Sequence, residues 1–175
     1  MLAWFGLRRK PAPPFRGPGV ARSARVRHPE KVRIDPTASV GEGVVLVGGQ
    51  GAGVDVGLEA QVNYYAVVLG GAGVSIGARA MVGPHCVLAA GNHDFRHPTL
   101  PARFAPGVSR GPIRLEEDVW LGSHVTVTDG VTIGRGAVIG AGSVVTHDVP
   151  AGMVAVGSPA KVVRAARDEP LAQAA

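Results

Sequence analysis

The chain has 175 residues, a length typical of one domain, and only 18% of them are charged and 5% aromatic. Its 26 glycines and 14 prolines disfavour helices, and its positive mean hydropathy argues against a disordered chain. These properties exclude a helical bundle and predict an all-β chain with many turns. The net charge of +5 comes from one end, because residues 1–33 contain nine Lys or Arg and a single acid, whereas the remainder contains nine bases and 12 acids.

Residues 1–33 are predicted to form a basic, Pro- and Arg-rich N-terminal tail. A short apolar stretch, Leu2 to Leu7, precedes Arg8, Arg9 and Lys10. A signal peptide has the opposite order, so we expect a cytoplasmic protein. The tail carries no aromatic or Gly-rich recognition pattern, and we expect no nucleic-acid partner. A solvated tail is the simplest interpretation, and weak contact with a membrane surface is the alternative.

The body of the chain, residues 34–164, has a six-residue repeat. An aliphatic residue recurs every six positions and a small or β-branched residue follows four positions later. The clearest aliphatic series is Leu115, Leu121, Val127, Ile133, Ile139 and Val145, and its partners are Val119, Val125, Val131, Ala137, Ser143 and Val149. Such a period predicts a parallel β-solenoid in which each unit is one short strand and a turn. At three units per coil, the repeats predict about five coils, followed by a short C-terminal tail at 165–175.

The repeat is interrupted at residues 92–112, where four prolines predict an extruded loop. His93 stands at the start of this loop and is a candidate general base, although it could merely cap a turn. His97 lies four residues further on, a spacing that suits metal binding on a helix face and not in a loop, so we expect no metal. The single cysteine, Cys86, occupies a small inward position, which predicts packing rather than reactivity.

From about Val62 to Arg164 the chain resembles the galactoside, maltose and nodulation O-acetyltransferase branch of the hexapeptide-repeat acyltransferases. The motifs are Asp118-Val-Trp-Leu-Gly-Ser-His124, Gly130-Val-Thr-Ile-Gly134, Ile139-Gly-Ala-Gly-Ser-Val-Val-Thr146 and Gly157-Ser-Pro-Ala-Lys-Val-Val-Arg164. The resemblance implies a left-handed parallel β-helix and a homotrimer with active sites between subunits. It also implies that acetyl-CoA is the acyl donor and that His93 is the catalytic base, taking a proton from an acceptor hydroxyl.

Further site residues are implied by the same resemblance. Asn63 and Trp120 would lie beside the acetyl group and the acceptor, although Asn63 could also be a turn residue. The backbone N–H of Ser123 would stabilise the oxyanion. The residues matching coenzyme A contacts are Ser123, Ala141, Thr146, His147, Lys161 and Arg164. With 18 residues per coil, Ser123 and Ala141 are expected to lie one above the other.

The sequence differs from the sugar acetyltransferases in the features that would contact the acceptor. Residues 1–33 do not resemble the helical N-terminal segment of the sugar acetyltransferases, and Gly71 stands where those enzymes have an acid. We therefore expect an acetyltransferase acting on a sugar of a surface polysaccharide or its precursor. The alternatives are a xenobiotic or aminosugar acetyltransferase, a zinc-dependent β-helix of the carbonic-anhydrase type and a non-catalytic β-helix scaffold.

Overall fold

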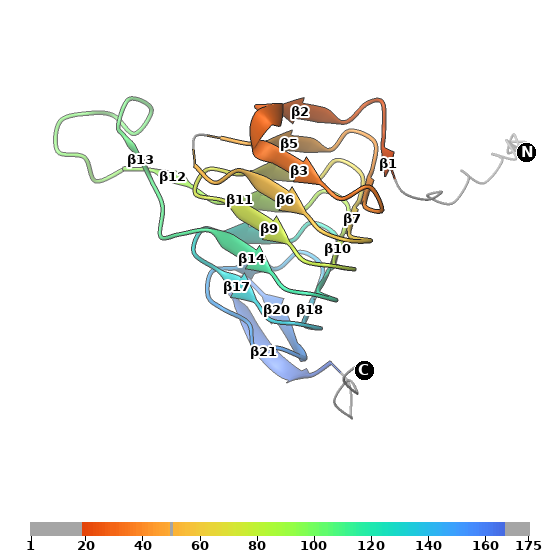
Figure 1. The fold of residues 1–175 in the computed structure, drawn as a ribbon. Helices are drawn as coiled ribbons and strands as arrows, with labels where there is room; N and C mark the ends of the chain where they lie inside the picture. The colour runs from red at the N-terminus through yellow and green to blue at the C-terminus, as the bar shows by residue number, and fades with distance from the viewer. Residues whose placement is uncertain (1–18, 50, 167–175) are drawn as a thin grey trace, which may run out of the picture.

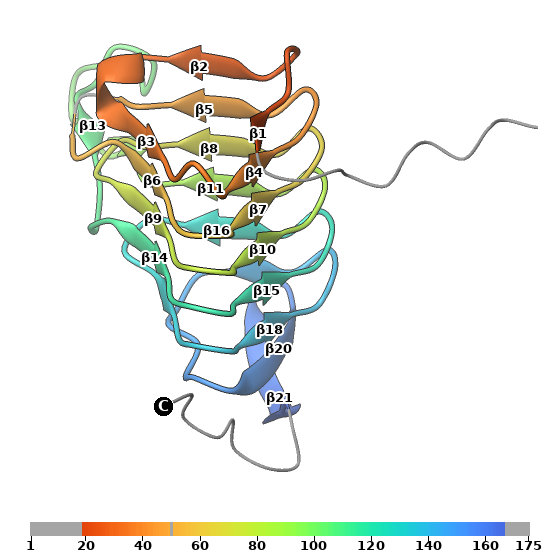
Figure 2. The ribbon, with the colours of Figure 1, turned by 45° about the vertical axis from the view of Figure 1, so that its right-hand side comes forward.

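A computed structural model describes residues 19–49 and 51–166. The chain winds into a parallel β-solenoid of about seven turns, with three sheets along its sides (Figures 1 and 2). The first sheet, sheet A, contains β1 (Gly19–Val20), β4 (Ser39–Val40), β7 (Gln61–Val62), β10 (Met81–Val82), β15 (Trp120–Leu121), β18 (Val138–Ile139) and β20 (Met153–Gly157), all parallel. β21 (Ala160–Ala165) then returns antiparallel to β20 and ends the described structure.

The other two sheets complete each turn. Sheet B contains β2 (Arg25–Arg27), β5 (Val45–Val47), β8 (Val67–Leu69), β11 (Val87–Ala89), β16 (Thr126–Thr128) and β19 (Val144–Val145). Sheet C contains β3 (Val32–Ile34), β6 (Val54–Val56), β9 (Val74–Ile76), β14 (Ile113–Leu115) and β17 (Thr132–Ile133). The one helical element in the described ranges is the short 3₁₀ turn η1 (Pro29–Lys31), so none of these residues form a helix long and apolar enough to cross a membrane.

Both predicted repeat series point into the solenoid. Leu121 pairs with Ile139, eighteen residues later in the sequence, and both side chains are fully buried. The small partner positions, such as Val125 and Ala137, are also fully buried. Burial of one such aliphatic side chain contributes about 1.5–3 kcal/mol, so the regular core is the main source of stability. Cys86 lies in this core, as predicted, and its thiol donates to the carbonyl of Gly122 at 3.1 Å.

The predicted start at residue 34 and the predicted five coils are wrong. The first coil is formed by β1, β2 and β3, within the segment that the sequence indicated as a tail. Val20 pairs with Val40 and Val26 pairs with Leu46, so the repeat phase extends upstream of Ile34. The charged residues of this segment misled the prediction because they occupy outward positions, which do not affect the core. The part of the predicted tail before Gly19 lies outside the described residues.

The segment 92–112 leaves the solenoid as an extruded loop, as predicted (Figure 1). It is not wholly irregular, however. Its base is an antiparallel pair of β12 (Asn92–His93) and β13 (Gly107–Val108), with His93 opposite Gly107. This pairing fixes the register of the two arms where they leave the body.

The outward faces of sheets B and C differ in polarity. In sheet B the outward positions of β5, β8 and β11 are aliphatic, so these strands read as continuous apolar runs. In sheet C the middle residues are Asp55, Ser75 and Arg114, giving the alternation of a strand with one solvated face. The outward face of sheet B is therefore apolar along these strands, unlike that of sheet C.

Candidate active site

His93 lies where the extruded loop leaves the solenoid. Its backbone N–H donates to Asn92 Oδ1 at 2.9 Å, and its carbonyl accepts the N–H of Phe95 at 2.9 Å. These bonds hold the backbone while the side chain stays exposed. Within the described ranges no group hydrogen-bonds to the imidazole, so the ring is available to an incoming ligand.

A hollow of about 480 Å³ opens beside His93, between the loop base and the ends of sheet B. Leu69, Gly71, Ala90 and Val108 form much of its wall. Gly71 is the position at which the sugar acetyltransferases carry an acid. A Cβ at Gly71 would lie 2.7 Å from the carbonyl oxygen of Ala90, so close backbone packing requires glycine here. The backbone packing in the wall of the hollow therefore leaves no room for an acidic side chain at position 71.

A second hollow, of about 400 Å³, lies on the other side of the loop base, and Arg110 and Asp129 line it together with His93. The Asp129 carboxylate accepts the Arg110 backbone N–H at 2.6 Å and the Arg110 Nε–H at 3.3 Å. Arg110 Nη2 also donates to the Asp129 carbonyl at 2.7 Å and to Thr128 Oγ1 at 2.8 Å. Because Asp129 is buried, this group of contacts clamps the returning arm of the loop to the solenoid. The sequence analysis missed both residues.

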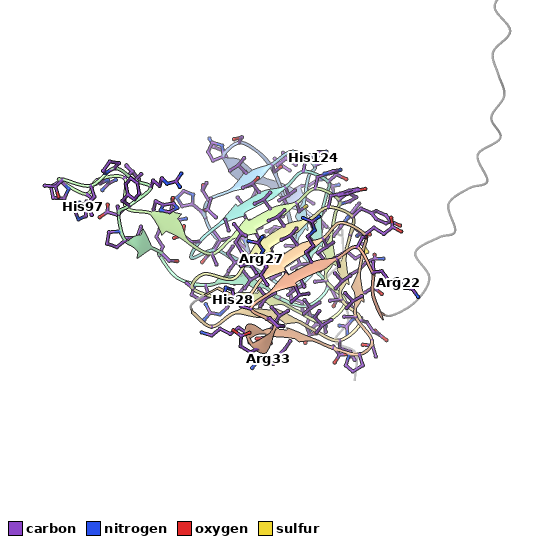
Figure 3. All side chains as sticks on the ribbon, turned by 90° about the horizontal axis from the view of Figure 1, so that it is seen from above. Arg22, Arg27, His28, Arg33, His97 and His124 are labelled. Carbon is purple, nitrogen blue, oxygen red and sulfur yellow. The ribbon has the colours of Figure 1, made fainter. Side chains whose placement is uncertain are left out.

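His97 does not join His93 in a metal site. Its Nδ1 accepts the backbone N–H groups of Thr99 and Leu100 at 3.3 and 3.0 Å, which shapes the outer part of the loop (Figure 3). Across residues 19–49 and 51–166, no three His, Cys, Asp or Glu side chains are grouped so as to hold a metal ion.

Four of the implied site residues lie on sheet A or at its corner with sheet B. The Nδ2 of Asn63 donates to the Val82 carbonyl at 3.0 Å. Trp120, paired with Met81, is 50% exposed on the outer face of sheet A. The Ser123 carbonyl accepts the N–H of Gly142 at 2.9 Å, so Ser123 and Ala141 lie in adjacent coils as predicted. No carbonyl in the described part of the chain accepts the Ser123 N–H, which leaves that donor available.

The remaining implied residues lie elsewhere. Thr146 and His147 are at the corner between sheets B and C, with Thr146 Oγ1 2.9 Å from His147 Nδ1. Lys161 and Arg164 are exposed on β21, at the C-terminal end of the solenoid. Within one chain, the implied residues therefore form separate groups: His93 lies at one edge of sheet B, and Ser123 and Ala141 lie at the other.

An exposed ladder of rings at the corner between sheets A and B was not predicted. The Tyr65 and His85 ring centroids are 5.3 Å apart, and those of His85 and His124 are 4.9 Å apart, with nearly parallel planes. All three residues have a left-handed backbone, with φ between 57° and 59°. The strand register would have revealed the ladder, because these residues occupy equivalent turn positions in successive coils.

Comparison with known proteins agrees with this fold. Residues 112–147 match the family described as bacterial transferase hexapeptide (six repeats). A solved hexapeptide-repeat-containing acetyltransferase from Vibrio cholerae is 31% identical, with 79% of this chain and 72% of that chain covered and a TM-score of 0.60. That protein has also been solved with acetyl coenzyme A. The chain belongs to the hexapeptide-repeat transferase family.

Two further similarities are more limited. A variant of an N-acyltransferase from Bacillus cereus, solved with dTDP-4-amino-4,6-dideoxyglucose and coenzyme A, is 23% identical, with 83% of this chain and 79% of that chain covered. Its TM-score of 0.73 shows the same fold. A 2,3,4,5-tetrahydropyridine-2,6-dicarboxylate N-acetyltransferase from Staphylococcus aureus (strain Newman) is 37% identical over 60 residues, 34% of this chain and 25% of that protein. The match thus spans about a quarter of that relative's length.

Proposed function

We propose that this protein transfers an acetyl group from acetyl-CoA to a sugar or a surface-polysaccharide precursor, with His93 as general base. The observation that carries the proposal is the exposed His93 imidazole at the mouth of the 480 Å³ hollow, on a loop base whose register is fixed by β12 and β13. Membership of the hexapeptide-repeat transferase family and the acetyl coenzyme A bound by the Vibrio cholerae relative support the choice of donor.

In this mechanism the imidazole of His93 takes the proton of the acceptor hydroxyl as its oxygen attacks the thioester carbonyl. The attack forms a carbon–oxygen bond and places a negative charge on the former carbonyl oxygen. The free N–H of Ser123 is suited to donate to this oxyanion. When the carbon–sulfur bond breaks, the thiol of coenzyme A leaves with the proton that His93 held, and the base is regenerated.

Coenzyme A would lie along the lower coils. Ser123 and Ala141 form a narrow edge of small residues, which suits a thin pantetheine arm. Lys161 and Arg164 on β21 provide exposed cations for the phosphates at the end of that path. Thr146 and His147 are separated from this edge by the width of sheet B.

We also propose that the protein is a homotrimer with active sites between subunits. Two observations support assembly: the apolar outer face of sheet B, and the separation of His93 from Ser123 within one chain. Trp120, half exposed on sheet A, would form a wall of the shared cleft.

The test of the assembly is a charge placed on the apolar face. Val87→Asp on sheet B is expected to yield monomers and to abolish acetyl transfer. Ser75→Asp, at an outward position of sheet C, is the matched control and is expected to leave both unchanged. Light scattering coupled to size-exclusion chromatography measures the mass. A trimeric Val87→Asp variant, or a wild-type monomer that is active, would contradict the proposal.

The test of the activity is release of free thiol from acetyl-CoA in the presence of sugar and amine acceptors. Wild type is expected to show acceptor-dependent release, and His93→Ala to lose it by about 10²–10⁴-fold, the range for a general base. His97→Asn is the control, because an asparagine oxygen can still accept the amides of Thr99 and Leu100. Neither thiol release nor coenzyme A binding by wild type would refute the proposal.

Amine acetylation is the second candidate. The Bacillus cereus neighbour is an N-acyltransferase solved with an amino sugar attached to a nucleotide, and the Staphylococcus aureus relative is an N-acetyltransferase. The same acceptor panel separates the two candidates, since a 4-amino sugar nucleotide and its 4-hydroxyl counterpart differ only in the attacking atom.

A further inference from the structure

The first coil carries three arginines without acidic partners. Arg22, Arg25 and Arg27 are exposed, and no carboxylate of the described chain lies within ion-pairing distance of them. Arg33, in the same coil, is different because Asp55 binds its guanidinium through two hydrogen bonds. Viewed along the solenoid from this end, Arg22 and Arg27 spread across the terminal coil (Figure 3).

These arginines mark the end of the apolar face. Arg25 and Arg27 are in register with Val45 and Val47, so sheet B changes from aliphatic to cationic at its last strand. β1, β2 and β3 each stand at the end of their sheet, at the extremity of the solenoid (Figures 1 and 2). The terminal coil therefore presents a broad end face with cations around its rim.

The sign of the charge identifies the partner. Charged side chains at a solenoid end prevent stacking of one copy on another, but either sign would serve that purpose. Here the terminal coil, residues 19–34, has five Lys or Arg and only Glu30, whereas acids outnumber bases in the rest of the described chain. A second copy stacked end to end on this coil would bring like charges together, so the complementary partner of the end face is an anionic surface.

The sequence that precedes the first coil favours a lipid surface over a nucleic acid as the anionic partner. The described structure begins at this end, with Gly19, and the sequence before Gly19 contains Trp4 and Phe5 among apolar residues, followed by Arg8, Arg9 and Lys10. Aromatic and aliphatic side chains next to cations suit the interface of an anionic bilayer, whereas a phosphate backbone needs cations alone. One apolar or one basic signal binds weakly, and two together give stable anchoring.

We propose that the first coil docks on an anionic lipid surface through Arg22, Arg25 and Arg27. Guanidinium groups bind lipid phosphates through paired hydrogen bonds, and an anionic leaflet attracts each basic residue near it. The proposal is independent of the acetyltransferase activity, because the three arginines lie on a different part of the molecule from His93.

The test is co-sedimentation of the full-length protein with vesicles of phosphatidylcholine alone or with one quarter phosphatidylglycerol. Wild type is expected to bind only the anionic vesicles, and 0.5 M salt is expected to release it. At about fivefold per basic residue, the variant R22Q/R25Q/R27Q should lose on the order of a hundredfold in partition coefficient. The control R96Q/R103Q/R114Q removes the same charge from other surfaces and should bind within about threefold of wild type.

Several results would overturn the proposal. The two triple variants could bind equally, which would mean that net charge alone, or residues before Gly19, account for the attraction. Wild type could bind neutral and anionic vesicles alike, or could bind double-stranded DNA while ignoring both. Circular dichroism melting of each variant confirms that a lost interaction is not a lost fold.

Discussion

The clamp between Arg110 and Asp129 gives the sharpest test of how the loop base positions His93. Arg110 follows β13 by two residues, and β13 pairs directly with β12, which carries His93. The Arg110 side chain donates four hydrogen bonds: two to Asp129 at 3.3 and 2.7 Å, one to Thr128 at 2.8 Å and one to the Thr146 carbonyl at 3.4 Å. Arg110→Met removes all four and keeps the aliphatic stem. The backbone N–H of residue 110 retains its bond to the carboxylate.

The free energy that Arg110→Met should cost follows from these contacts. A hydrogen bond to a charged group contributes about 1.5–3 kcal/mol, but the Arg110 side chain is 57% exposed and solvent weakens each bond. The Asp129 side chain, at 10% exposed, loses its counter-charge in the variant. Together these effects should destabilise attachment of the returning arm by about 2–3 kcal/mol. The core is untouched, so the solenoid itself should unfold at nearly the wild-type temperature.

Hydrogen exchange and kinetics measure the two consequences. Amide protection of β12 and β13 should fall by about 30- to 150-fold, since about 1.4 kcal/mol corresponds to a factor of ten. If His93 is the base, kcat should fall by up to about 100-fold while KM for acetyl-CoA changes less, because within the described residues Arg110 contacts the proposed coenzyme site solely through the backbone carbonyl of Thr146. Arg114→Met, on the outer face of sheet C, is the matched control. Unchanged protection and unchanged kcat in Arg110→Met would refute the positioning role.

Three further predictions concern the core and the corners. Leu121→Ala should destabilise the protein by about 2–5 kcal/mol in chemical unfolding, since the side chain is fully buried and the repeat cannot close around the cavity; a loss below about 1 kcal/mol would be inconsistent with this packing. Burial raises the pKa of the Cys86 thiol, so the native protein should resist maleimide at pH 7 and react once denatured; fast native labelling would contradict this. Gly43→Ala places a Cβ in steric conflict with the Tyr65 ring at a φ of +68°, whereas Gly142→Ala at +73° meets open space. The first should therefore lower the melting temperature more than the second, and equal effects would show that the ring simply moves away.

The sequence predicted the solenoid because its core depends on a short period. Each six-residue unit buries one aliphatic and one small side chain, so the core can be read without any long-range information. The first coil was missed for a physical reason. Val20 and Val26 are six residues apart and align with Val40 and Leu46, but Val26 and Ile34 are eight residues apart, which interrupts the six-residue spacing. In addition, Arg25 and Arg27 occupy the outward positions on either side of Val26, so the segment has the composition of a basic tail. A strand requires only that alternate side chains be apolar.

The sequence predicted which site residues are neighbours only where the strand register alone places them next to each other. Ser123 and Ala141 are eighteen residues apart, one full coil, and are neighbours as the spacing predicted. The clamp between Arg110 and Asp129 could not be found in this way, because the extruded loop between residues 92 and 112 breaks the period. Its return path depends on side-chain contacts that no repeat encodes.

The same reasoning explains why the proposed base and the proposed oxyanion donor lie apart within one chain. A solenoid brings together residues at the same corner in successive coils, but residues at different corners stay separated by the width of a sheet at every level. His93 and Ser123 are at different corners, on opposite edges of sheet B, and lengthening or shortening the solenoid would not bring them closer. In the proposed trimer, a second copy seated on the apolar outer face of sheet B would provide the missing contact without changing the repeat. The proposal then makes assembly a requirement for catalysis, so a substitution that breaks the assembly without unfolding the chain, such as Val87→Asp, is expected to abolish the activity as well.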